Sequence, residues 1–256
     1  LAKFGGVSLV GWYEMANRMV IQLRSLLNSA SEALVPAFAH LQQTDAEAVQ
    51  RVYLDAYRMV FFLVWPALAF TVVATPLISE VWIGRYEPHF VNYAFLMAGG
   101  LFLAMLSTPA FMANMGLGTL RPNMVSYASM VLVVAILGTV LGLVHGGAGV
   151  VAAFAIAYLV GGSVILFPYH RRHGLPLRSL LSRENLPVMA GSVLAMAAGL
   201  VTYYELRDHL GLGAIAALVF AGWALPLIGP VWLHPLRARL GAMLSRRFRR
   251  APGGAS

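Results

Sequence analysis

The chain has 256 residues, of which 59% are hydrophobic and 11% are charged, and its formal net charge at pH 7 is +8. Soluble domains carry about 25% charged residues, so this composition excludes an ordinary soluble protein and is typical of an integral membrane protein. The absence of cysteine excludes disulfide bonds, thiolate metal sites and thiol nucleophiles.

The segment from Val7 to Leu41 is long enough to cross the bilayer, yet it is polar around half of its circumference when drawn as a helix. Charged side chains at membrane depth usually face a bundle interior or an aqueous pathway, so this arc predicts a functional cavity. The alternative is an amphipathic helix on the membrane surface. The apolar arc continues as far as Pro36, which favours a spanning helix. The candidate binding residues on the polar arc are Glu14, Asn17, Arg18, Gln22, Arg24 and Asn28.

The rest of the chain is a series of apolar stretches of membrane-crossing length. Residues 122–170 lack Asp, Glu, Lys and Arg, and they accommodate two spans of about 20 residues joined by a turn at Gly146. Thr75-Pro76 is expected to end the second span. We predict an all-α membrane bundle of about seven spans, forming one lobe over residues 1–233. The predicted spans are 7–40, 52–74, 91–115, 123–144, 148–168, 187–203 and 211–233.

The cations are distributed unevenly between the two ends of the predicted bundle. With alternating connections, twelve arginines fall on one face, against only Lys3, Arg85 and Arg207 on the other. The positive-inside rule therefore predicts a cytoplasmic C-terminus. The basic tail at 234–256 suits either a helix on anionic lipid or a plain orientation signal. Because position explains the net charge, we expect membrane lipids as partners and no nucleic acid.

Within the polar arc, the two arginines differ in their local partners. Arg18 lies four residues after Glu14 and can pair with it. Arg24 has no acidic residue three or four positions away, so its partner is expected to be another helix, water or an anionic ligand. A guanidinium in a cavity is suited to a bidentate grip on phosphate. Asp55 and Arg58, on the second span, are three residues apart and are expected to pair with each other.

Few residues elsewhere suit catalysis or metal binding. Glu80 and Glu87 flank a predicted outer loop and are expected to be solvated charges. His145, His170 and His173 lie in or near connections, at no spacing typical of a metal site, and are expected to be ordinary interfacial histidines. We therefore predict no enzymatic activity, no metal site and no cofactor.

Several segments resemble the oligosaccharide flippases of O-antigen and exopolysaccharide pathways, in the multidrug, oligosaccharidyl-lipid and polysaccharide exporter superfamily. VGWYEMANRM (10–19) and ALVPAFAHL (33–41) resemble the entry and exit of one family helix. TPLISEVWIGRYEP (75–88) and GLGTLRPN (116–123) are similar to two of its loops. HGGAGVVAAFAIAYLV (145–160) and YHRRHGLPL (169–177) are similar to a helix start and to the basic loop that follows it.

The resemblance implies a protein of about twelve to fourteen helices in two lobes around a cationic cavity. This chain would be the C-terminal lobe, and the N-terminal lobe of the same protein would be absent from it. The implied activity is transfer of an undecaprenyl-pyrophosphate-linked oligosaccharide from the cytoplasmic to the periplasmic leaflet of the bacterial inner membrane, in cell-surface polysaccharide biosynthesis. The alternatives are a cation-coupled multidrug antiporter of the same superfamily and an integral-membrane polysaccharide polymerase or ligase.

Overall fold

The computed structural model describes residues 2–41 and 46–236, and helices joined by short connections make up this region. No strand occurs among these described residues. The predicted all-α fold is therefore confirmed. The expected basic tail lies outside the described residues from position 237 onward.

The polar N-terminal segment forms α1 (Ala2–Ser31), which is followed by a short turn and then α2 (Leu34–Leu41). The backbone of Gly6 is non-helical, with φ 73°, so the uninterrupted part of α1 begins at residue 7. The prediction of one continuous helix over 7–40 is wrong, because the helix ends at Ser31. Pro36 accounts for the break, since a proline ring displaces the carbonyl of the residue four positions earlier, here Glu32.

The second long helix, α3 (Ala46–Ile83), continues through Pro66 and Pro76. The expected end of this helix at Thr75-Pro76 is therefore wrong. The Thr75 hydroxyl donates a hydrogen bond to the carbonyl of Thr71, one turn earlier, at 2.6 Å. Side-chain hydrogen bonds of this kind help a membrane helix to accommodate a proline.

The next helical segment is divided at Ser107 into α4 (Pro88–Leu106) and α5 (Thr108–Gly116). Pro109 lies in the first turn of α5 and cannot donate a backbone hydrogen bond to α4. The side chains of Asn114 and Asn123 fix the following turn. Asn114 Nδ2 donates to Asn123 Oδ1 at 2.9 Å, and Asn123 Nδ2 donates to the carbonyl of Phe111 at 3.1 Å.

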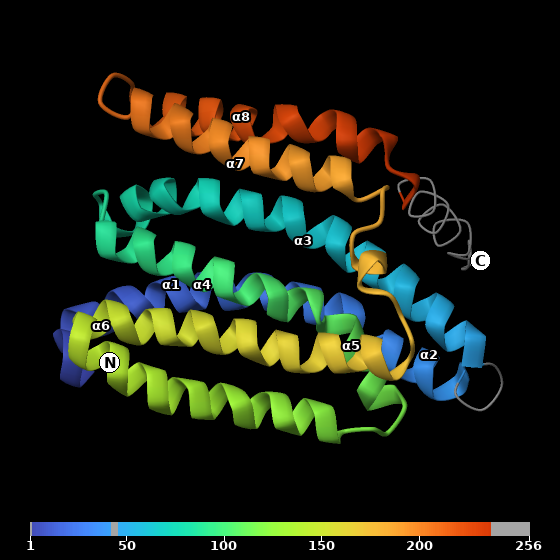
Figure 1. Ribbon diagram of the computed structural model, residues 1–256. Coiled ribbons are helices and arrows are strands. Elements are labelled where there is room, and N and C mark those ends of the chain that lie inside the picture. The colour runs from blue at the N-terminus through green and yellow to red at the C-terminus, as the bar shows by residue number, and fades with distance from the viewer. Residues whose placement is uncertain (1, 42–45, 237–256) are drawn as a thin grey trace, which may run out of the picture.

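α6 (Arg121–Arg172) is a hairpin of two helical limbs (Figure 1). Gly146 has φ 61° and ψ −144°, a conformation that glycine adopts readily, and the chain reverses there. We call residues 121–145 the first limb and residues 147–172 the second limb. The second limb packs closely on α4, since a Cβ added to Gly100 would lie 2.5 Å from Ala155 Cα. Small residues permit such close backbone packing between membrane helices.

The last described helices, α7 (Leu186–Leu206) and α8 (Leu212–Leu233), form an antiparallel pair. The pair packs mainly on itself and on α3, and it stands apart from α6 in Figure 1. α1 instead packs on α4 and α6. The bundle therefore has a main body of α1 to α6 and a C-terminal helix pair attached through α3.

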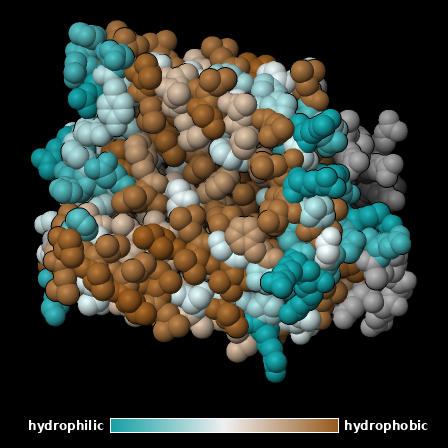
Figure 2. Space-filling model, viewed as in Figure 1, coloured by the Kyte–Doolittle hydropathy of each residue, from teal (hydrophilic) through white to brown (hydrophobic). Residues whose placement is uncertain are grey.

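Five helices of the described region are long and apolar enough to cross a membrane: α3, α4, α6, α7 and α8. The visible face of the molecule is mostly hydrophobic between hydrophilic groups at its two ends (Figure 2). An apolar belt of this kind matches the hydrocarbon core of a bilayer. The chain is therefore a multi-pass membrane bundle.

Candidate functional site

The polar arc of α1 is divided into two stripes by its packing. Asn17, Arg24 and Asn28 are half-buried, and their spacing of seven and four residues places them on one face of the helix. The second stripe is exposed and consists of Glu14, Arg18 and Gln22. The six predicted residues thus do not converge on a single point within this chain.

Two residues of the half-buried stripe, Arg24 and Asn28, line the same pocket. Hydroxyl side chains of Ser107, Thr108 and Ser126 line it as well, and they come from the α4–α5 junction and the first limb of α6. The cavity volume is about 60 Å³. This volume holds roughly four water molecules, so the pocket suits a compact polar group rather than an oligosaccharide.

The break between α4 and α5 shapes one side of this pocket. Thr108 is the first residue of α5, so the N-terminal turn of that helix borders the cavity beside Arg24. Helix N-termini carry partial positive charge and favour anions. The guanidinium of Arg24 and the α5 terminus therefore both favour an anion in this pocket.

The two limbs of α6 form the opposite side. The Ser126 hydroxyl donates to the carbonyl of Gly161 at 2.8 Å. A Cβ at Gly161 would lie 2.5 Å from Met130 Sδ, and one at Gly162 would lie 2.9 Å from the backbone of Leu103. These two glycines therefore allow the first limb and α4 to approach the second limb closely at the pocket wall.

Arg24 also contacts an aromatic ring of the second limb. Its Cζ lies 5.8 Å from the centroid of the Tyr158 ring. Throughout the described ranges, no carboxylate lies within ion-pair distance of Arg24. Cation–π contact positions a guanidinium without neutralising its charge. The Arg24 guanidinium is therefore held at the pocket without an acidic partner from the described residues.

Asn17 lies on the same face of α1, seven residues before Arg24. Its Oδ1 atom is buried and has no hydrogen-bond partner among the residues that the structure describes. A buried amide oxygen without a partner is costly, so water or a ligand group is expected to satisfy it.

The local pairings expected on the first two spans have different outcomes. Asp55 and Arg58 form the expected ion pair, at 3.5 Å, so that prediction is confirmed. Glu14 and Arg18 form no ion pair within the described part of the chain, although the spacing permits one. Both side chains are exposed on α1 and are available to a group outside this chain.

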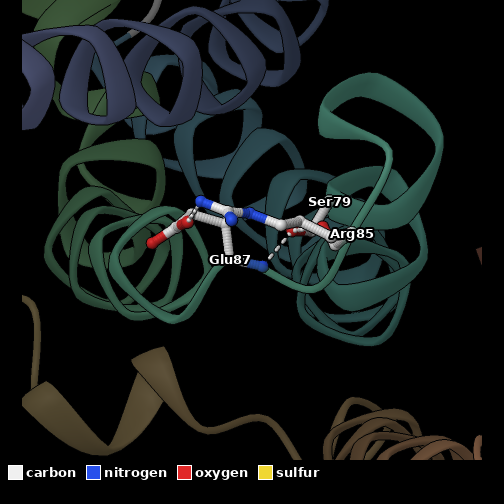
Figure 3. A network of polar contacts seen from close by, with 3 residues as sticks. All are labelled: Ser79, Arg85 and Glu87. Carbon is white, nitrogen blue, oxygen red and sulfur yellow. Dashed lines mark hydrogen bonds and ion pairs between the residues drawn. The ribbon is translucent and has the colours of Figure 1, made fainter.

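The expectation that Glu80 and Glu87 are merely solvated loop charges is wrong. Glu87 is buried, and its carboxylate accepts a hydrogen bond from Arg85 Nη2 at 3.1 Å. Ser79 Oγ accepts from the backbone N–H of Glu87 at 2.8 Å and donates to the carbonyl of Arg85 at 3.0 Å (Figure 3). Glu80 accepts a hydrogen bond from the Tyr203 hydroxyl. Glu87 therefore stabilises the connection between α3 and α4, and Glu80 joins α3 to α7.

The histidines also differ from expectation. His145 is exposed and His173 is half-buried, but His170 is only 1% exposed and lies in the core. Its Nε2 atom lies 2.7 Å from the Tyr53 hydroxyl. The interfacial position expected for His170 is therefore wrong. Within the described residues, no group of three His, Cys, Asp or Glu side chains could hold a metal ion.

Residues 1–87 match a family model described as "Polysaccharide biosynthesis protein". The expected family resemblance is confirmed. This family match covers the first third of the chain, including α1 with all six predicted binding residues. No curated protein matches the sequence.

The fold is similar to a solved structure titled "Lipid II flippase MurJ, inward closed conformation", with a TM-score of 0.64 and 14% sequence identity. The similarity covers 85% of this chain and 46% of that chain. The chain therefore spans about half the length of the flippase structure, and at this identity the likeness concerns the fold. The family match therefore points to polysaccharide biosynthesis, and the structural match concerns the fold.

Sequence reasoning found Arg24 and Asn28 but missed the rest of the pocket. Ser107, Thr108 and Ser126 are ordinary hydroxyl residues in apolar helices, and only tertiary packing places them beside Arg24. The Thr108-Pro109 pair inside an apolar run was the available signal, because proline in the first turn marks a helix start.

Proposed function

We propose that the chain is one lobe of a flippase that moves an undecaprenyl-pyrophosphate-linked oligosaccharide from the cytoplasmic to the periplasmic leaflet. The protein would act in O-antigen or exopolysaccharide biosynthesis in the bacterial inner membrane. A charged saccharide headgroup cannot cross about 30 Å of hydrocarbon unaided, so it needs a polar and cationic path. In this proposal the polar arc of α1, with both of its stripes, belongs to that path.

The observation that carries the proposal is the pocket of Arg24 and Asn28. Arg24 has no acidic partner in the described region, and the pocket accommodates a group of phosphate size. Charge-assisted hydrogen bonds from a guanidinium to phosphate contribute about 1.5–3 kcal/mol each. We assign the pyrophosphate contact to Arg24 and Asn28. Asn17 and the exposed Glu14, Arg18 and Gln22 are assigned to the neighbouring saccharide path.

The exposed stripe of α1 favours a second lobe opposite this one. Glu14 and Arg18 lie within a long helix whose other face packs on α4 and α6. Such charges are expensive against lipid and are expected to face protein or water. A facing N-terminal lobe of the same protein, as in two-lobe exporters, would enclose them.

The two alternatives have less support from these residues. A cation-coupled drug antiporter needs intramembrane acids, whereas the pocket presents a cation, which repels cationic drugs. A polymerase or ligase needs a cluster of acid, base or nucleophile around a reacting bond. The pocket offers one guanidinium, an amide and hydroxyls, which bind an anion without reacting with it.

The test uses the full reading frame in cells that lack their own flippase, with surface polysaccharide as the measurement. Arg24→Ala should abolish export, and Arg24→Lys should impair it even though the charge is kept, because lysine lacks the forked donors. Loss of one charge-assisted bond weakens binding by roughly ten- to a hundred-fold.

The matched control is Arg121→Lys, because Arg121 is exposed at the start of α6 and does not line the pocket. Membrane levels of every variant are measured by immunoblot, so that poor insertion is separated from poor transport. Normal export by Arg24→Ala at normal protein level would refute the phosphate contact. Equal effects of Arg24→Lys and Arg121→Lys would refute a specific need for the guanidinium of Arg24.

A further inference from the structure

An apolar groove runs between the two limbs of α6. Val131 and Val134 of the first limb and Phe154 and Tyr158 of the second limb line it, and its volume is about 420 Å³. Val131 is 67% exposed, so the groove is open at the molecular surface. Both limbs belong to a helix of membrane-crossing length, so we expect the groove to lie at the depth of the lipid chains.

The groove adjoins the Arg24 pocket. Tyr127 and Met130 line both cavities. Tyr158 lines the groove and carries the cation–π contact with Arg24. A cationic compartment and an apolar compartment therefore share one wall.

This arrangement matches a lipid whose phosphate is bonded directly to its hydrocarbon chain. In a polyprenyl phosphate the first isoprene unit follows the phosphate oxygen, so anion and hydrocarbon are adjacent. In a glycerophospholipid, the glycerol and ester groups separate the phosphate from the acyl chains. Tyr127 and Met130 line both the pocket and the groove, so an anion in the pocket and an apolar chain in the groove would lie next to each other.

We infer that the groove between the limbs of α6 holds the phosphate-proximal part of the prenyl chain while the phosphate lies at Arg24 and Asn28. This inference rests on the proposed function and adds to it a site for the lipid. Apolar contact along the groove contributes affinity in proportion to the buried area. The two compartments together select a prenyl phosphate over a free phosphate and over a bilayer phospholipid.

The test measures binding of undecaprenyl phosphate to the purified full-length protein in lipid nanodiscs, with phosphatidylglycerol as the second probe. Val131→Trp and Ala135→Trp fill the groove from its rim and should weaken undecaprenyl phosphate binding by about ten-fold or more. Val140→Trp is the matched control, because Val140 is an exposed residue of the same limb outside the groove, and it should leave binding unchanged.

The outcomes separate this inference from the proposed function. If Arg24→Ala abolishes binding and export while both tryptophan variants bind normally, the groove assignment is overturned and the flippase proposal stands. If the tryptophan variants reduce phosphatidylglycerol binding to the same degree, the groove is a general lipid contact and the inference is overturned. If the tryptophan variants alone reduce undecaprenyl phosphate binding, the groove stands and the phosphate assignment at Arg24 fails.

Discussion

The hydroxyl of Tyr53 and Nε2 of His170 lie 2.7 Å apart, and this contact joins α3 to the end of the second limb of α6 across 117 residues of sequence. Both side chains are buried. The other ring nitrogen of His170, Nδ1, has no hydrogen-bond partner among the described residues. The hydrogen bond with Tyr53 therefore offsets most of the cost of burying the polar His170 ring.

Tyr53→Phe should lower the stability of the protein by about 1–3 kcal/mol, because it leaves His170 buried without its hydroxyl partner. Thermal unfolding in detergent measures the change. The control is Tyr57→Phe, since Tyr57 lies in the same aromatic cluster and no hydrogen bond of its hydroxyl to another described residue is present. Equal destabilisation by the two variants would contradict a specific contribution of the Tyr53–His170 bond.

Gly100 and Gly99 form a natural matched pair on α4. A Cβ at Gly100 would lie 2.5 Å from the backbone of Ala155, whereas a Cβ at Gly99 meets nothing within 4 Å. Gly100→Ala should separate α4 from α6 and destabilise the protein by about 1–3 kcal/mol. Gly99→Ala should be neutral or slightly stabilising, because alanine favours helix. Midpoints of thermal unfolding in detergent distinguish them, and a harmless Gly100→Ala would disprove the close packing.

The absence of cysteine allows the orientation to be tested by single-cysteine labelling. We expect Ser179→Cys, in the basic 173–185 connection, to react only from the cytoplasmic side. His209→Cys, in the α7–α8 connection at the other end of α7, should react with an impermeant maleimide from the periplasm. The reverse pattern would invert the proposed topology.

His234 gives a pH dependence whose direction follows from its hydrogen bonds. Its Nδ1 accepts the backbone N–H of Leu236 at 3.2 Å, so the ring proton is on Nε2, which donates to Asn185 Oδ1 at 2.9 Å. Burial lowers the pKa of His234 below its usual value, and Glu184 opposes this effect. The unfolded chain therefore binds a proton more readily than the folded one.

The stability contribution of His234 is complete above pH 6.5, the ordinary histidine pKa, and is lost as the pH falls from there through the lowered pKa of the folded state. His234→Gln should reduce the loss of thermal stability between about pH 7.5 and about pH 5.5. His145→Gln, at an exposed histidine, is the control and should leave that loss unchanged. An identical pH profile for His234→Gln and the wild type would exclude this linkage.

Composition and hydropathy were sufficient to predict an all-α membrane bundle. A long apolar run in a bilayer must satisfy its own backbone hydrogen bonds, and a helix does so within the segment. The helix breaks were harder to predict. Proline was expected to end a helix at Pro76, yet α3 continues through it, whereas the chain is interrupted beside Pro36 and Pro109. Whether a proline ends a helix depends on which neighbouring groups replace the missing hydrogen bond, and sequence alone does not contain that information.

The candidate site was predictable only where one helix determines it. Periodicity identified Arg24 and Asn28 because both lie on one face of α1. The residues that complete the pocket, such as Ser107 and Gly162, lie about 80 to 140 positions after Arg24 in the sequence. Only packing brings them beside it. The same limit explains why Glu87 was expected in solvent although Arg85 and Ser79 hold it in a buried position.

The attachment of α7 and α8 through α3 has a consequence for how the protein is made. None of the residues that line the Arg24 pocket or the α6 groove belongs to this helix pair. Synthesis proceeds from the N-terminus, so every residue that lines the two cavities leaves the ribosome before α7 does. The pocket can therefore assemble on the nascent chain, and the last helix pair then packs mainly on α3 to complete the described bundle.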